Sequence, residues 1–120
     1  MYPPEVIKVL YRKGRQLNLK IEEHEKYGLE FIEAERKYNV ALSTKMFLLK
    51  SEGNAISTCE KLAKGDQLIA DLKFEMDKQD ILRDSCKKAL SAIFAQIDCL
   101  RSDLSFQKLD YKNIGATQQA

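Results

Sequence analysis

The stretch IADLKFEMDKQDILRDSCKKALSAIFAQIDCLRSDL, residues 69–104, decides the fold, because its apolar residues recur at alternating intervals of three and four. Ten of thirteen positions in this spacing are apolar when the series is extended to residue 111: Ile69, Leu72, Met76, Gln79, Arg83, Cys86, Leu90, Ile93, Ile97, Leu100, Leu104, Gln107 and Tyr111. A strand repeats every two residues and could not sustain this period over such a length. The stretch therefore predicts one long amphipathic helix.

The first half of the chain gives a second, weaker series. Between residues 7 and 49 the same spacing finds eight apolar residues at thirteen positions, and two of the others are glycine. The chain has 120 residues, 5 of them Gly, and both of its prolines stand at positions 3 and 4, so no obligatory helix breaker follows. The composition, 44% hydrophobic and 32% charged, excludes the turn-rich all-β folds and predicts an all-α chain.

Between the two series lies a short connection with recognisable helix signals. Gly53 suits the left-handed C-cap of the first helix, and Asp66 suits the N-cap of the last. Ser57 and Glu60 have the spacing of a capping box, which predicts a short helix between them and Gly65. We therefore predict helices over about 5–52, 57–64 and 66–111, which form one antiparallel, coiled-coil-like hairpin domain over residues 1–112, with a frayed tail at 113–120.

A register for the two long helices follows if Glu52 lies opposite Asp66. Facing residue numbers then add to about 118, and Glu35 meets Arg83 in the middle of the hairpin. Each is a charged residue in a mainly apolar series. We interpret Glu35 and Arg83 as a structural pair in which each charge neutralises the other.

Both long helices also carry apolar residues outside the series that would pack in the hairpin. The connecting helix, with Ile56, Cys59 and Leu62, can cover only those near the turn. The rest would face water, and a large exposed apolar patch on a small protein marks an interface. The sequence therefore predicts a protein partner, or a second copy that completes a helical bundle, at residues that include Leu29, Ile32, Phe47, Phe74, Ile81 and Phe94.

Charge changes sign sharply along the first helix. Residues 1–20 hold five basic residues against Glu5, whereas residues 21–35 hold six glutamates against Lys26. The basic segment could contact phosphates or an acidic protein, or could be an ordinary helix end. Overall the formal charge is only +2 and no basic stripe continues along the hairpin, so protein is favoured over nucleic acid. The candidate contact residues are Lys8, Arg12, Lys13 and Arg15.

No motif in the sequence indicates catalysis, a cofactor or a metal. His24 is the single histidine, and position 28, one turn further on, is Gly. The three cysteines lack CxxC spacing, so we interpret them as reduced, small hydrophobic residues. No signal-like or membrane-spanning stretch is present. We expect a non-enzymatic, soluble, cytoplasmic protein.

Several segments resemble a known group of proteins. They are Ala34–Leu42, Leu49–Gly53, Leu62–Asp66 and Ile69–Lys73. Over about residues 30–108 the chain is similar to small helical proteins of phages and prophages of Gram-positive bacteria, which have no assigned activity and are often encoded among early replication and recombination genes. The first thirty residues are less similar, so the resemblance does not extend to the basic segment. It implies a helical fold and a phage origin, and it transfers no catalytic residue.

Three functions are compatible with these features. The leading hypothesis is a phage-encoded binding protein that acts on a host or antiphage-defence protein, as an inhibitor or adaptor, in the cytoplasm of the infected bacterium. The alternative is an accessory factor in phage DNA replication or recombination that binds a recombinase, a single-strand binding protein or DNA. A structural protein of the virion is a weaker third hypothesis.

Overall fold

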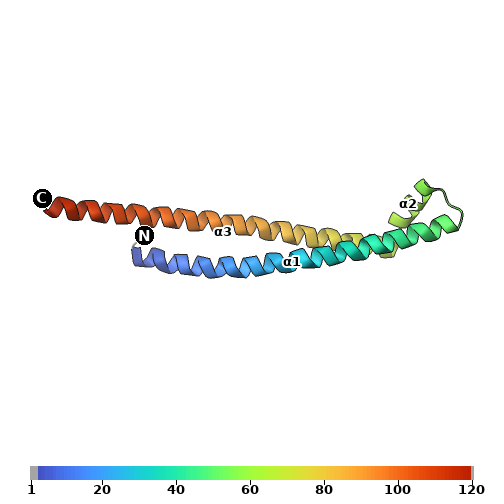
Figure 1. Cartoon of the computed structure of the whole chain (residues 1–120), viewed down its shortest axis with the longest axis horizontal. Coiled ribbons are helices and arrows are strands. Elements are labelled where there is room, and N and C mark those ends of the chain that lie inside the picture. Colours follow the sequence, from blue (N-terminus) through green and yellow to red (C-terminus); the bar gives the residue numbers. More distant parts are fainter. Residues whose placement is uncertain (1–2, 120) are drawn as a thin grey trace. The chain divides into compact units, whose positions relative to one another are not determined.

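The protein is all-α, as the sequence predicts. The computed structural model describes residues 3–119, with the side chains of residues 3–110 and 112. Three helices follow one another: α1 (Pro3–Ser51), α2 (Ile56–Lys64) and α3 (Gln67–Gln119) (Figure 1). No strand occurs within the described range. Two long helices joined by a short one make a helical hairpin, and the chain divides into two compact units.

The first unit pairs the start of α1 with the later part of α3. It comprises Met1–Glu23 and Cys86–Ala120. Val6, Cys86 and Ile93 are its buried apolar side chains among those described. The Cys86 thiol donates a hydrogen bond to the carbonyl oxygen of Lys20, with Sγ and O 3.4 Å apart, so the two helices approach closely there.

The second unit, His24–Ser85, contains the rest of α1, all of α2 and the start of α3. Its core is a cluster to which each of the three helices contributes: Leu49, Cys59, Ala63 and Ile69, with Tyr38, Ala41, Leu42 and Met46 packed against it. Cys59 and Ala63 are one helical turn apart, so α2 turns one narrow face inward. Small side chains on that face let α2 lie close to the two long helices.

Gly53 ends α1 in the way that the sequence predicts. Its φ of +95° is in the left-handed region that other residues avoid. The Gly53 N–H donates to the Lys50 carbonyl at 3.0 Å, and the Asn54 N–H donates to the Leu49 carbonyl at 3.3 Å. These two bonds form a Schellman motif, which satisfies carbonyl groups at the end of the helix.

The two predicted N-caps have different outcomes. Asp66 caps α3 as predicted, because its Oδ1 accepts from the backbone N–H groups of Leu68 at 3.1 Å and Ile69 at 3.3 Å. The predicted capping box of α2 is wrong. That helix begins at Ile56 with Ala55 as its N-cap, so Ser57 already lies inside the first turn, and Glu60 accepts a hydrogen bond from Lys64 at 2.8 Å instead.

α3 continues beyond the predicted end at residue 111. Its helix reaches Gln119, so residues 113–119 are helical rather than frayed. No proline interrupts this segment, and Gly115 alone costs only about 1 kcal/mol relative to Ala in a helix. The starts of the helices agree with prediction to within two residues.

Candidate protein-binding surface

Contacts in the second unit show that the predicted register is wrong. Nζ of Lys73 lies 5.7 Å from the centroid of the Tyr38 ring, and Nζ of Lys45 lies 3.8 Å from Oδ2 of Asp66. Facing residue numbers therefore add to about 111 rather than 118. The reason is α2, which packs against the end of α1, so that α3 begins at the level of Lys45 and not of Glu52.

Arg83 consequently has partners other than Glu35. Its Nη2 lies 2.6 Å from Oδ1 of Asp80, and its guanidinium carbon lies 4.4 Å from the centroid of the Phe31 ring. Among the described side chains Glu35 makes no ion pair with Arg83, and it is exposed. The Arg83 charge is thus held by a carboxylate one turn away on its own helix and by an aromatic face on α1.

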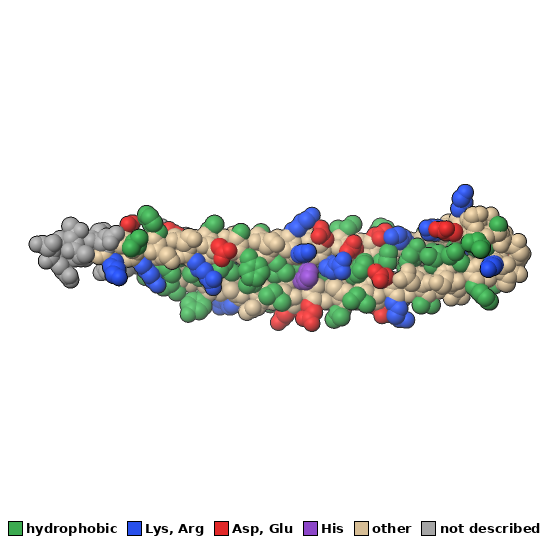
Figure 2. Space-filling model, turned by 45° about the horizontal axis from the view of Figure 1, so that its top comes forward, with side chains coloured by type: hydrophobic (Ala, Val, Ile, Leu, Met, Phe, Trp, Pro, Cys, Tyr) green, Lys and Arg blue, Asp and Glu red, His purple; other side chains and the backbone are tan. Residues whose placement is uncertain are grey.

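The apolar residues predicted to face water do so. Exposed fractions range from 51% to 76% for the six candidate partner-binding positions: Leu29, Ile32, Phe47, Phe74, Ile81 and Phe94. Figure 2 shows hydrophobic side chains scattered between charged ones on the face in view. Their exposure is confirmed, and their role in binding stays a prediction.

On α1, the exposed apolar residues of the second unit surround a neutralised ion pair. Nε and Nη2 of Arg36 lie 3.2 Å and 2.6 Å from the two carboxylate oxygens of Glu33. This two-pronged hydrogen bond lowers the pKa of Glu33 and raises the pKa of Arg36, so both stay charged around neutral pH. The Glu33–Arg36 pair lies between Ile32 and Val40 in the sequence and carries no net charge.

The connecting helix leaves further apolar side chains exposed. The sequence predicts that Ile56, Cys59 and Leu62 cover residues near the turn, but only Cys59 is buried. Ile56 and Leu62 are exposed, and so is Leu68 at the start of α3. Ala63 occupies the inward position that Leu62 was expected to take, because positions 59 and 63 share the inner face of α2.

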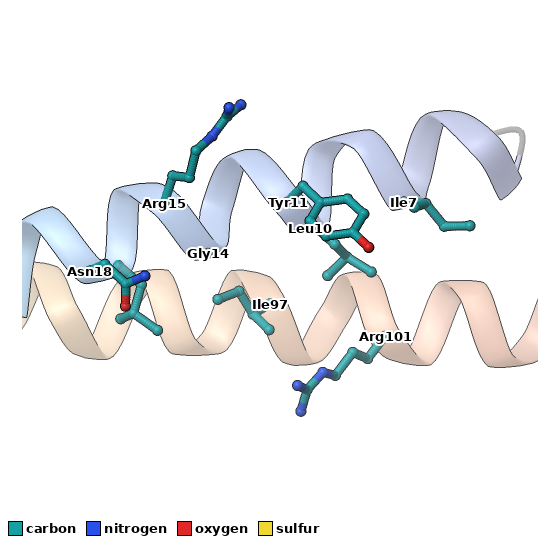
Figure 3. Close-up of a pocket in the computed structure, with 9 residues that line it drawn as sticks. Ile7, Leu10, Tyr11, Gly14, Arg15, Asn18, Ile97 and Arg101 are labelled. Atoms are coloured by element: carbon teal, nitrogen blue, oxygen red, sulfur yellow. The ribbon is translucent and has the colours of Figure 1, made fainter.

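A groove in the first unit lies beside the basic residues of α1. It has a volume of about 610 Å³. A Cβ built on Gly14 would meet nothing within 4 Å, so the absence of a side chain there leaves space in the groove wall. In the close-up, Ile97 lies between the two helices, while Arg15 and Arg101 extend outward from α1 and α3 (Figure 3). Its lining comprises Ile7, Leu10, Tyr11, Gly14, Arg15, Leu17, Asn18, Ile97 and Arg101.

The basic side chains near this groove are available for a partner. Lys8, Arg12 and Arg15 are exposed, and in the described part of the chain they form no ion pair. The same holds for Arg101 at the groove. Lys13 is half-buried and lies 3.4 Å from the side-chain oxygen of Gln16. Three of the four predicted basic contact residues are therefore presented to solvent, and the structure adds Arg101, which the sequence reasoning missed because it lies on the other helix.

The second unit has a groove of its own. Its volume is about 460 Å³, and it is lined by Glu30, Glu33, Ala34, Lys37, Leu72, Glu75 and Gln79. Of its three carboxylates, Glu30 lies 3.9 Å from Nζ of Lys26 and Glu33 is paired with Arg36, so the lining carries little net charge.

Metal ligands and cysteine thiols are the remaining candidate groups for chemistry among the described residues. Within them, no group of three or more His, Cys, Asp or Glu side chains could hold a metal ion. Cys59 and Cys86 are buried, whereas Cys99 is exposed. Burial raises the pKa of the Cys86 thiol, and the Glu23 carboxylate raises it further while Lys20 opposes both. A protonated, buried thiol is a poor nucleophile.

None of the described helices combines the length and the apolar character that crossing a membrane requires.

Comparisons with known proteins identify no relative: no family model matches the chain, and neither a curated protein nor a solved structure matches it.

Proposed function

We propose that the chain is a non-enzymatic, phage-encoded binding protein that acts by contact with a host or antiphage-defence protein, as an inhibitor or adaptor. The observation that carries the proposal is the exposure of large apolar side chains in the second unit. Phe47 is 76% exposed, Phe74 is 69% exposed and Ile81 is 66% exposed. Phage origin and action in the bacterial cytoplasm rest on the resemblance of residues 30–108.

Energetics favour a docking role for these side chains. Fully burying one Phe or Ile side chain stabilises an association by about 1.5–3 kcal/mol, and aromatic side chains are frequent among the residues that dominate binding energy. Phe47 is 76% exposed and is not part of the core cluster that Leu49 and Met46 join. A protein partner would remove this surface from water.

Affinity capture with matched variants tests the proposal. The tagged chain and its Phe47→Ser and Phe74→Ser variants would be used to capture proteins from bacterial cells. Lys50→Ser serves as a control at an exposed charged position of α1, the helix that carries Phe47. We expect a specific protein to bind the wild type and the control, and to bind the Phe variants with a Kd raised about tenfold or more. Equal capture by all four chains would reject this surface.

The alternative, an accessory factor in phage DNA replication or recombination, is favoured by one observation. Lys8, Arg12, Arg15 and Arg101 are exposed cations with no ion-pair partner in the described part of the molecule. Phosphate binding by such side chains weakens steeply as salt rises, because counterions are released. Salt-dependent binding of single-stranded DNA that is lost in Arg12→Glu would support this role, and absence of binding at low salt would exclude direct DNA contact.

A further inference from the structure

The basic and acidic segments of α1 carry complementary side chains at matching intervals. In the first unit, Lys8, Tyr11 and Arg15 are exposed and separated by three and four residues. In the second unit, Glu25, Leu29 and Ile32 are exposed and separated by four and three residues. Such intervals place each set on one face of the helix. The two sets have the same spacing when one of them is read in reverse.

Read in reverse, the sets correspond residue by residue. With Arg15 opposite Glu25, an antiparallel helix pair places Tyr11 opposite Leu29 and Lys8 opposite Ile32. The first match joins opposite charges, and the second joins an aromatic ring to an aliphatic side chain. In the third, the aliphatic stem of Lys8 covers an apolar side chain while its ammonium group stays in water. A parallel pair would set intervals of three and four against four and three, and the side chains would fall out of step.

Arg15 and Glu25 are available to form an ion pair between two antiparallel helices. Arg15 is exposed without an ion-pair partner among the described residues, and Glu25 is likewise exposed and unpaired there. Neither has to break an existing ion pair to form a new one. Lys26 and Glu30 already lie 3.9 Å apart on the acidic segment, so their charges largely offset each other.

The groove beside Arg15 has room for an apolar side chain. Gly14 has no side chain to fill it, and the side chains of Leu10 and Ile97 provide apolar walls. Leu29, which is 64% exposed in its own chain, has the size and polarity to enter it. Arg101 at the groove adds a second cation that attracts an acidic segment.

We propose that this groove and the basic face formed by Lys8, Tyr11 and Arg15 bind the acidic face of a second copy of the chain, formed by Glu25, Leu29 and Ile32, with the two α1 segments antiparallel. Charge complementarity and matched spacing favour a second copy over an unrelated acidic protein. Phe47, Phe74 and Ile81 take no part in this contact, so self-association and partner binding can be tested separately.

Charge exchange between two variants provides the test. Arg15→Glu makes the basic face acidic, and Glu25→Lys makes the acidic face basic, so each variant repels its own copies. In a mixture, the carboxylate introduced at position 15 of one variant meets the ammonium group introduced at position 25 of the other. The unchanged Arg15 and Glu25 of the two variants also remain available to each other. Lys78→Glu and Glu52→Lys, at exposed positions outside both faces, reproduce the two charge changes as controls.

Sedimentation equilibrium of the full chain measures the outcome, with 13.8 kDa as the mass of one copy. We expect self-association of the wild type and both controls, a Kd raised by about tenfold or more in each face variant, and recovery in the equimolar mixture. Circular dichroism checks that every variant stays helical. A wild type that is monomeric up to about 100 μM, or one that binds a foreign acidic protein and not itself, would overturn the proposal. Association unaffected by either substitution, or a mixture that fails to recover, would overturn it equally.

Discussion

Nζ of Lys45 lies 3.8 Å from Oδ2 of Asp66, and this relationship sets the level at which the two long helices meet. Both side chains are about one-third exposed, so the attraction itself is worth only about 0–1 kcal/mol. Its significance is geometric. Asp66 caps α3, and the cap lies beside Lys45 because α2 occupies the space next to the last turns of α1.

The register makes a prediction about Arg83. A double-mutant cycle on Phe31→Leu and Arg83→Met should give a coupling of about 0.5–1 kcal/mol, because the guanidinium group lies 4.4 Å from the ring centroid. The cycle on Glu35→Ala and Arg83→Ala should be additive within about 0.5 kcal/mol. Urea unfolding measures both cycles. Strong coupling between Glu35 and Arg83 would contradict the register of 111.

Three glycines should respond to alanine in opposite directions. At Gly14 and Gly28 a Cβ would meet nothing within 4 Å, so each change should raise the free energy of unfolding by about 0.5–1 kcal/mol through helix propensity. Gly53 has a φ of +95°, so the same change should destabilise by about 1 kcal/mol or more. Thermal unfolding followed by circular dichroism would detect these shifts, and a stabilising effect at Gly53 would argue against the Schellman cap.

The inner face of α2 gives a third prediction. Ala63 is fully buried, so Ala63→Leu should overpack the cluster and destabilise by about 1–3 kcal/mol. Leu62→Ala is the matched control, because Leu62 is 49% exposed and its removal should cost under about 1 kcal/mol. Chemical denaturation of the two variants compares them directly. A larger loss at Leu62 than at Ala63 would mean that α2 presents a different face.

Periodicity was sufficient to predict the two long helices and the exposed apolar residues, and the short connection was sufficient to predict that the helices are antiparallel. Gly53 and Asp66 also act as predicted, because caps depend on local backbone geometry that few residue types can provide. The groove at Gly14 was not predictable from either helix alone, since Arg101 and Ile97 reach it from α3.

The predicted register of 118 was wrong for a different reason. A heptad-like series repeats every seven residues, so shifting one helix by seven positions again sets apolar residues against apolar residues. Only the packing of α2 distinguishes these alternatives, and it depends on Cys59 and Ala63 facing inward. The paired charges of Glu35 and Arg83 suggested a plausible contact, but Asp80 and Phe31 lie nearer to Arg83.

Thiol reactivity should separate the three cysteines. Cys99 is exposed, whereas Cys59 and Cys86 are buried, so a thiol reagent should modify one residue rapidly and two slowly in the folded protein. Mass spectrometry of partly labelled protein would identify the residue. Cys99→Ser should abolish the fast phase without changing stability by more than about 0.5 kcal/mol. Fast labelling of Cys86 in the native state would show that the first unit opens readily there.

Alkaline pH should weaken the fold through Cys86. Its thiol, with an ordinary pKa of 9.0, has a raised pKa in the folded chain because burial disfavours the thiolate, and the nearby Glu23 carboxylate adds to the effect. The unfolded chain therefore releases this proton at a lower pH than the folded chain. The stabilising contribution is complete below the unfolded pKa and is lost as pH rises through the folded pKa.

Urea unfolding between neutral pH and about pH 10 tests this dependence. The free energy of unfolding should fall more steeply for the wild type than for Cys86→Ser, whose hydroxyl does not ionise in this range and can still donate to the Lys20 carbonyl. Parallel slopes for the two proteins would show that the Cys86 thiol ionises equally in both states and is not desolvated.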